Sequence, residues 1–419
     1  MAEETIPVTA EAGTLKGPEV VSLWSLFWVF LKIGSTAFGG FMALISVVQN
    51  YMVERRKLIR HEDMLDAISL ATMLPGPIAV NVVAYTGFKL RGVIGAVVTA
   101  TAVTLPSFVL LLILSYAYFT WGEIPSVNRF FQGFIPAVAA IIVAAVWNMG
   151  RKNITGRTEF VLALAAALLL LFREPLGIPG LLATVLIILV AGVVGYLMFR
   201  PKAPEAPDAS KAGAAGTEER RPRGSGKLYS SALIPAAGVV APLLSTDILL
   251  AGKLLATFAG MSVLLFGGGF VFIPLMQESV VTQYGWLTQQ EFVDGIALGQ
   301  VTPGPIVMTA TFAGFKVGGL LGATAATIGI FTPPAVIMLI ASHYLERIKS
   351  SAHIKAALKG IRSAIIGLIA AAAYVVASTA EVHWLSLAIF ALALLALMRF
   401  KLEVVWIIPT AGMAGFLLY

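Results

Sequence analysis

Long apolar runs, separated by short polar stretches, occupy most of this chain. A helix needs about 20 apolar residues to cross the hydrocarbon core of a bilayer, and these runs have about that length or are slightly shorter. They lie near residues 92–119, 128–148, 158–172, 179–199, 229–247, 320–344, 356–377, 384–398 and 404–419. The pattern predicts an all-α polytopic membrane protein in which neighbouring helices shield the shorter ones.

Two more apolar segments, 20–53 and 63–90, are interrupted near their middles by glycine or proline. The interruptions recur 228 residues later: Phe38-Gly39-Gly40 as Phe266-Gly267-Gly268, and Pro75-Gly76-Pro77 as Pro303-Gly304-Pro305. Further matches at this offset, or at one residue less, are Gln49 with Gln277, Asp66 with Asp294, Lys89 with Lys316, Pro106 with Pro333 and Gly133 with Gly360. A fixed offset over so long a stretch predicts two homologous halves.

The repeat predicts how the chain is organised. An N-terminal tail at 1–19 precedes a first membrane repeat at 20–199, a flexible linker at 200–228, a connecting transmembrane helix at 229–249 and a second membrane repeat at 250–419. The linker is rich in Pro, Ala, Gly and Arg and has no periodic apolar face, which is typical of disorder. The tail is acidic and lacks an apolar core, so no secretory signal is expected.

Basic residues in the polar loops indicate the orientation of each half, since they gather on the cytoplasmic side. In the first half they cluster at 55–60, at 151–157 and in the linker. In the second half the stretch 277–290, equivalent to the first cluster, has no Lys or Arg, whereas 347–355 is basic. The halves are therefore predicted to be inverted relative to each other. This holds whether the interrupted segments cross the membrane or form re-entrant hairpins. The hairpins are favoured because they place every basic loop inside.

The interruptions also predict a binding site. Two prolines remove two backbone donors and push the residues before them out of the helical region, so a helix ending near Leu74 restarts near Ile78. Irregular backbone at membrane depth is tolerated only inside protein or beside an aqueous cavity. Four broken elements can direct the N–H groups of their helix starts at one oxyanion. Alternatively, the glycines only permit close helix packing. The duplication of two different motifs favours the cavity.

Composition narrows the function. Hydrophobic residues make up 58% of the chain, charged residues 12%, and the mean hydropathy is +0.89. There is no cysteine, and the four histidines show no ligand spacing, so neither a metal nor a cofactor is predicted. No nucleophile or paired acid and base indicates an enzyme. Cytoplasmic loops, rather than nucleic-acid binding, account for the net charge of +7.

The two duplicated motifs, Gly285-Trp286-Leu287-Thr288 and the stretch from Asp294 to Pro305 resemble the long, two-half members of the chromate ion transporter family. The resemblance covers nearly the whole chain except the tail and the linker. It implies secondary transport of chromate, with sulfate as a similar tetrahedral dianion, outward across the cytoplasmic membrane and conferring chromate resistance. The second half has Gln300-Val301-Thr302 where the first has Thr72-Met73-Leu74, so unequal roles are expected.

The predicted substrate site is formed by the interruptions and by polar residues that flank them. Its members are Phe38, Gly39, Gly40, Pro75, Gly76, Pro77, Asn81, Phe266, Gly267, Gly268, Gln300, Thr302, Pro303, Gly304, Pro305 and Thr309. Charged candidates for substrate attraction or coupling are Lys32, Asp66, Lys89, Asp294 and Lys316. The matched lysines could equally cap helix ends, and a structural role at helix starts is favoured for the matched aspartates over proton coupling. Lys32 is the stronger candidate for a site charge.

We expect alternating access around this fixed site. Carriers of a carboxylate or phosphate, and an anion channel, are the open alternatives. The expected partners are the oxyanion and the lipid bilayer, without nucleic acid. The sequence leaves the transport direction, the coupling ion and the oligomeric state open, a homodimer included.

Overall fold

The computed structural model describes residues 21–37, 40–122, 124–173, 177–199, 245–266, 269–378 and 383–418. All regular elements in these ranges are helices, so the predicted all-α class is confirmed. Five of the helices are long and apolar enough to cross a membrane, and shorter apolar helices accompany them. The predicted tail and linker lie outside the described residues. So does the connecting helix at 229–249, except for its last residues, which begin the first helix of the second half.

The helices follow the same order in both halves. The first half contains α1 (Leu23–Thr36), α2 (Gly40–Gln49), the π-helical segment η1 (Asn50–Arg55), α3 (His61–Met73), α4 (Ile78–Trp121), α5 (Pro125–Gln132), α6 (Phe134–Asn153), α7 (Arg157–Leu171) and α8 (Gly180–Phe199). The second half contains α9 (Ser245–Ser262), η3 (Gly269–Val271), α10 (Phe272–Met276), the π-helical segment η4 (Gln277–Gln283), α11 (Gln289–Val301), η5 (Ile306–Met308), α12 (Thr309–Ser342), α13 (Leu345–Ser350), α14 (Ala352–Ser378), α15 (Trp384–Met398) and α16 (Val404–Leu418).

The repeat extends to the backbone angles. The π-helical segments η1 and η4 occupy equivalent positions, and each is followed by a residue with positive φ, Lys57 at 51° and Gly285 at 59°. Near the middle of each long helix the chain turns sharply, at Gly92 with φ 64° and at Gly319 with φ 56°. Equivalent left-handed residues at equivalent points confirm that the halves are homologous in structure as well as in sequence.

These sharp turns fold α4 and α12 back on themselves. In α4 the Thr99 hydroxyl donates to the Val83 carbonyl over 3.1 Å, which holds the arm before the turn against the arm after it. In α12 the hydroxyls of Thr311 and Thr327, one on each side of the turn, bond over 2.8 Å. Each long helix is therefore a short arm, 78–90 or 306–317, followed by a long arm that crosses the membrane.

The short arms complete two re-entrant hairpins. Lys89, at the end of the first short arm, lies 3.3 Å from Asp63 at the start of α3, and Lys316 lies 2.7 Å from Glu291 at the start of α11. Both ends of each interrupted segment thus lie on the same side, with the Pro-Gly-Pro motif at the tip. A helix of 13 residues such as α3 is about 20 Å long, too short to cross a core of about 30 Å. The segment 63–90 and its counterpart thus have the favoured re-entrant arrangement, whereas the break in the segment 20–53 lies partly outside the described residues.

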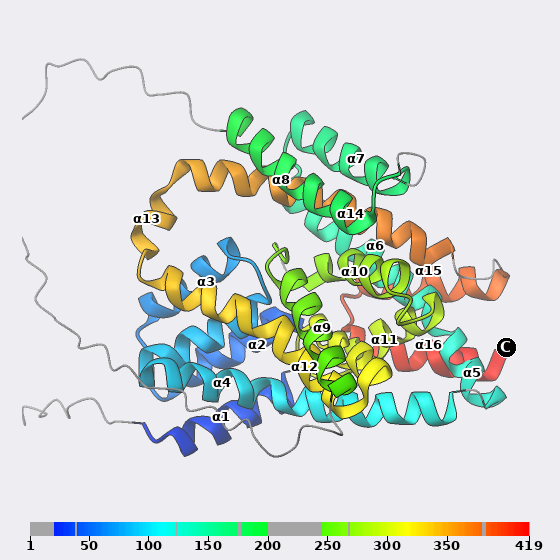
Figure 1. Cartoon of the computed structure of the whole chain (residues 1–419), viewed down its shortest axis with the longest axis horizontal. Coiled ribbons are helices and arrows are strands. Elements are labelled where there is room, and N and C mark those ends of the chain that lie inside the picture. Colours follow the sequence, from blue (N-terminus) through cyan, green and yellow to red (C-terminus); the bar gives the residue numbers. More distant parts are fainter. Residues whose placement is uncertain are drawn as a thin grey trace, which may run out of the picture.

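The two halves are related by an inversion. The start of α4 lies beside the late part of α12, since a Cβ atom on Gly76 would fall 2.2 Å from that of Pro334. The equivalent contact joins the chain just before α12 to the later part of α4. There a Cβ atom on Gly304 would fall 2.7 Å from the Ser107 hydroxyl. The long arms therefore run in opposite directions, as Figure 1 shows. A twofold axis across these helices, in the membrane plane, produces that arrangement, as predicted.

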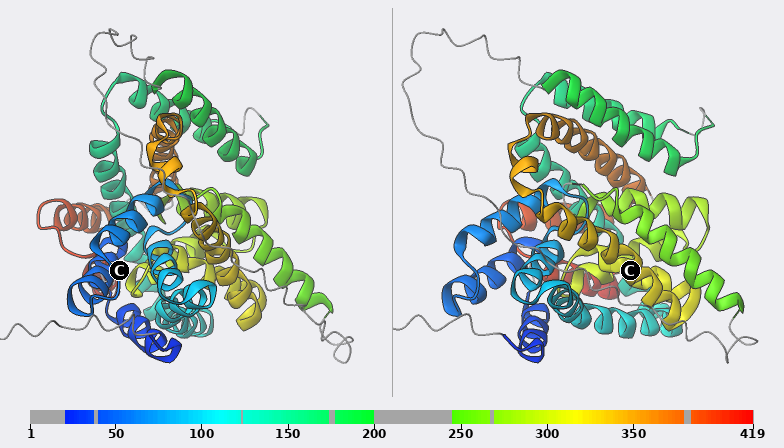
Figure 2. Two further views of the ribbon diagram at one scale, coloured as in Figure 1. Left: turned by 90° about the vertical axis from the view of Figure 1, so that its left-hand side faces the viewer. Right: turned by 60° about the vertical axis from the view of Figure 1, so that its left-hand side comes forward.

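The last two helices of each half pack on the other half. The α7 and α8 pair lies along α14, as the right view of Figure 2 shows, and α15 and α16 pack on α5 and α6. Equivalent glycines permit both crossings. A Cβ atom on Gly360 would lie 2.1 Å from the Ala191 carbonyl oxygen, and one on Gly133 would lie 2.1 Å from that of Ala411. Small residues allow such close helix approach in membranes. The halves therefore exchange helices.

Candidate functional site

The tip of the first Pro-Gly-Pro hairpin is buried and tightly held. Gly76 has φ 107°, a backbone angle that residues other than glycine rarely adopt. The neighbouring Pro334 also leaves no room for a Cβ atom at this position. Its N–H group donates to the Leu265 carbonyl over 2.8 Å. The Asn81 side chain, 1% exposed, donates to the Pro75 carbonyl over 3.1 Å. Asn81 and Leu265 thus fix the shape of this tip.

The second tip has the same backbone but different polar neighbours. Gly304 has φ 129°, and the hydroxyls of Thr302 and Thr309 donate to the carbonyls of Gly299 and Ile306 over 2.8 Å each. Among the described residues, two buried polar groups near this tip lack a hydrogen-bond partner, the Gln300 amide nitrogen and the Ser107 hydroxyl. Uncommitted donors therefore remain at the second tip. Buried polar groups normally have a hydrogen-bond partner, so we expect a ligand or a water molecule to bind to these two.

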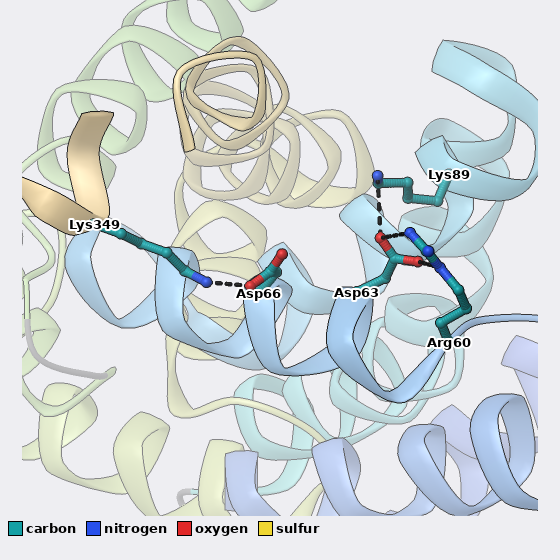
Figure 3. A network of polar contacts seen from close by, with 5 residues as sticks. All are labelled: Arg60, Asp63, Asp66, Lys89 and Lys349. Carbon is teal, nitrogen blue, oxygen red and sulfur yellow. Dashed lines mark hydrogen bonds and ion pairs between the residues drawn. The ribbon is translucent and has the colours of Figure 1, made fainter. Parts of the chain in front are cut away.

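The matched lysines close the bases of the hairpins. Lys89 pairs with Asp63 and also lies over the Tyr85 ring, 5.5 Å from its centroid. Lys316 pairs with Glu291 and lies 4.8 Å from the centroid of the Phe119 ring. In the first half a second cation, Arg60, joins the carboxylate (Figure 3). Its hydrogen bond holds the pKa of the Asp63 carboxyl below the usual range. Both lysines are thus engaged in structural ion pairs.

The matched aspartates both connect a hairpin to the other half, in different surroundings. Asp66 on α3 forms an ion pair with Lys349 on α13 (Figure 3). Asp294 on α11 is only 1% exposed, and it accepts hydrogen bonds from the Tyr118 hydroxyl at 2.8 Å and the Gln290 amide at 3.1 Å. The first link is half-buried and ionic, whereas the second is buried and made by neutral donors. Each carboxylate therefore has a structural partner.

The remaining predicted residues are distributed differently. Phe38, Gly39, Gly267 and Gly268 lie outside the described residues, Gly40 begins α2, and Phe266 packs on the core. Lys32 is exposed on α1, with no ionic partner in the described ranges, and it does not line the cavity at the first tip. The structure thus places predicted polar residues at each Pro-Gly-Pro tip, Asn81 at the first and Thr302 and Thr309 at the second. Lys32 lies apart from the cavity at the first tip.

A cavity of about 590 Å³ reaches the first hairpin tip. Its lining residues are Met42, Thr72, Ile78, Ile141, Ala144, Ala145, Asn148, Met149, Lys152, Asn153, Phe270, Arg362, Leu397 and Val404. Arg362 is half-buried in the middle of α14, and Asn148 and Lys152 are exposed near the end of α6. The sequence analysis did not select Arg362. An arginine inside the apolar run 356–377 was nevertheless a signal, since charged residues at membrane depth are costly and usually functional.

A smaller cavity, of about 250 Å³, occupies part of the equivalent position in the other half. Ala371 and Ala372 line it where Ala144 and Ala145 line the larger cavity. Its charged lining residues, Arg173 and Glu278, form an ion pair with each other. The two cavities thus differ in size and in available charge.

Sequence comparison assigns this arrangement to a known family. The two halves match the family described as chromate transporter, at residues 24–196 and 252–416. The chain belongs to the chromate transporter family. Similar proteins include the chromate transport protein of Cupriavidus metallidurans, 28% identical over 99% of this chain and 97% of the relative, and that of Pseudomonas aeruginosa, 30% identical over 98% and 95%. A probable chromate transport protein of Synechococcus elongatus is 28% identical over 94% and 95%. No solved structure is detectably similar.

Membership of the chromate transporter family confirms several sequence predictions. The protein is a multi-pass membrane protein for ion transport, and it is not an enzyme. The family domain occurs twice, at residues 24–196 and 252–416, as expected for two homologous halves. The hairpin tips and the two cavities are therefore features of a transport protein.

Proposed function

We propose that this protein is a secondary transporter that carries chromate out of the cytoplasm across the cytoplasmic membrane. The names of its relatives support chromate as the substrate. The observation that carries the proposal is the pair of inverted re-entrant hairpins whose Pro-Gly-Pro tips lie inside the protein, each followed by a helix start. Helix starts present free N–H groups and a positive dipole end to an anion.

Alternating access is the mechanism that fits an inverted repeat. The larger cavity runs from the first tip toward the end of α6. Arg151 and Lys152 at that end, with Arg157 at the start of α7, indicate that this side faces the cytoplasm. The smaller cavity lies on the opposite side, beside the Arg173–Glu278 ion pair. In this proposal the structure corresponds to an inward-open state, and rocking of the hairpins would open the other side.

The substrate site in this proposal comprises both tips and their polar neighbours, with Asn81 and Thr309 shaping the backbone and Gln300 donating to the anion. Sulfate has the charge and shape of chromate and would bind to the same donors. A second anion class, such as carboxylate or phosphate, is the alternative substrate. Assembly as a homodimer is compatible with the exposed apolar helix faces.

Oxyanion flux into proteoliposomes tests the function. Purified protein is reconstituted, and labelled chromate and sulfate are supplied with and without a pH gradient. Gly76→Leu and Gly304→Leu place a side chain in each tip, while Gly252→Leu, at an exposed glycine with open space around it, is the matched control. We expect saturable chromate flux that both tip variants abolish and the control keeps. Folded protein that moves no chromate under any gradient would exclude the proposal.

A further inference from the structure

We propose that Arg362 binds the tetrahedral oxyanion at the inner end of the larger cavity, where its guanidinium and the start of the α4 helix face the same space. The inference deepens the proposed function and rests on it. It selects one of the two hairpin tips as the binding position in this state of the protein.

The position of Arg362 is set by α14 and by the end of α3. Its Nη2 atom donates to the Thr72 carbonyl oxygen over 2.7 Å. Thr72 is near the C-terminal end of α3, directly before the Pro-Gly-Pro tip, and Ile78, directly after the tip, lines the same cavity. The guanidinium therefore lies beside the broken tip rather than at a membrane surface.

Among the described residues, no carboxylate neutralises the charge of Arg362. Several other cations are paired with a carboxylate, as Lys89, Arg173, Lys316, Lys349 and Lys359 are. Within the ranges that the structure describes, no carboxylate lies within 4 Å of the Arg362 side chain. A guanidinium has five N–H donors in a fork that matches an oxyanion, and the Thr72 carbonyl accounts for one contact. A half-buried, unpaired cation is costly, and a bound dianion would offset that cost.

The helix start borders the same cavity through Ile78. In the part of the chain that the structure describes, the N–H groups of Ile78, Ala79 and Val80 have no acceptor, whereas the Asn81 N–H donates to the Pro77 carbonyl. Unpaired N–H groups in the first turn and the helix dipole favour an anion. Arg362 adds a full charge to this helix start, and charge-assisted hydrogen bonds are the stronger kind.

The remaining lining residues give the cavity an entrance from the cytoplasm. Lys152 and Asn148 are exposed on α6, on the side that carries the basic loops. Lys152 would raise the local concentration of an anion at this entrance. The site occurs once, because the residue equivalent to Arg362 in the first half is Ile135, which is buried.

Transport kinetics and binding test the proposal on the full-length protein. Arg362→Gln removes the charge, Arg362→Lys keeps it without the fork, and Arg347→Gln, on the exposed α13 of the same side, is the matched control. We expect Arg362→Gln to raise KM for chromate at least about tenfold, the size of a lost charge-assisted contact. It should also abolish the chromate-induced rise in the unfolding midpoint. For both quantities, Arg362→Lys should give a value between those of the wild type and Arg362→Gln. The Arg347→Gln control should match the wild type.

A purely structural role for Arg362 gives a different result. Loss of the Thr72 contact alone would lower the unfolding midpoint without chromate and leave KM and the chromate-induced shift unchanged, which would overturn the inference. Wild-type protein that neither moves chromate nor is stabilised by it would instead overturn the proposed function. The two failures are therefore distinguishable.

A second experiment avoids any effect of Arg362 on folding. The chain has no cysteine, so Asn148→Cys in the cavity and Trp147→Cys, which neighbours it and is not a lining residue, can be labelled after folding. A bulky anionic methanethiosulfonate should block chromate flux at position 148 but not at 147. Small neutral methyl methanethiosulfonate should have little effect at either. Full flux after complete bulky labelling of Asn148→Cys would show that the substrate does not use this cavity.

Discussion

The tip at Gly76 and its counterpart at Gly304 have equivalent backbones and contacts but different neighbours. At the first tip the glycine N–H group is bonded to Leu265, and a half-buried arginine and a large cavity lie alongside. At the second tip two buried donors have no partner among the described residues, and the cavity on that side is smaller and contains its own ion pair. Duplication kept the chain path, while side-chain changes gave one side an open, cationic cavity.

The links between the halves differ in the same way. Asp66 joins its hairpin to the other half through an ion pair with Lys349, in which both side chains are partly exposed. Asp294 makes the equivalent link through Tyr118 inside the protein. Water can therefore compete for the first link but not for the second. Separating the two halves at the Asp66–Lys349 link, on the cytoplasmic side, should therefore require less free energy than separating them at the Asp294–Tyr118 link.

Alanine at the two tip glycines should give the largest difference between the halves. Gly76→Ala sets a Cβ atom against the Pro334 ring, which cannot rotate away, whereas Gly304→Ala meets a Ser107 hydroxyl, which can. A displacement of about 1 Å in a binding group can lower a rate about 100-fold. We therefore expect chromate flux to fall by about that factor in Gly76→Ala, and by about tenfold or less in Gly304→Ala. Initial flux in proteoliposomes measures both, and equal losses would mean that the tips are functionally equivalent.

Removing one partner from each interhalf link should give a smaller difference, in stability. Tyr118→Phe leaves the buried Asp294 carboxylate short of a donor, which costs about 1–3 kcal/mol. Lys349→Met leaves a carboxylate that water can solvate and should cost about 0–1 kcal/mol. Thermal unfolding in detergent measures both changes. Tyr116→Phe, at an exposed tyrosine on the same helix, is the control. A larger loss from Lys349→Met than from Tyr118→Phe would reverse this ranking.

The ion pairs at the hairpin bases should show the least difference. Double-mutant cycles on Lys89 with Asp63 and on Lys316 with Glu291 should each give a coupling of about 0.2–1 kcal/mol, as for other partly exposed pairs. The pKa of Asp63 is lowered in the folded state by the Arg60 hydrogen bond. Its contribution is therefore present above the unfolded pKa of about 4 and is lost as the pH falls through the lower folded value. A first-half coupling that persists well below that pH would contradict the assignment.

Sequence alone was sufficient for the repeat, the inversion and the hairpins, because each depends on local chemistry. Pro75 and Pro77 end one helix and allow the next to start at Ile78, and the basic loops set the orientation. The exchange of α7 and α8 for α15 and α16 was not predictable, since uniformly apolar helices carry no signal of their partner. The glycines at 133 and 360 became informative only once their contacts were known.

The site was predicted less completely than the fold. The duplicated motifs directed attention to matched residues, so Arg362, which has no charged counterpart, was not selected. Lys89 and Lys316 were correctly placed at the ends of the short arms, but their carboxylate partners depend on the hairpins closing. Whether the hydroxyls of Thr302 and Thr309 face a ligand or a carbonyl depends on rotamers, which the sequence does not determine.

The exchange of helices between the halves also bears on biosynthesis. Helices α7 and α8 enter the bilayer before the ribosome has made α14, against which they finally pack. Until then their small-residue faces, including Gly195, are in contact with lipid or with an insertion chaperone. Completion of the first half therefore waits for the second, so a chain truncated after α8 should be unable to reach its mature form and become a substrate for membrane proteases.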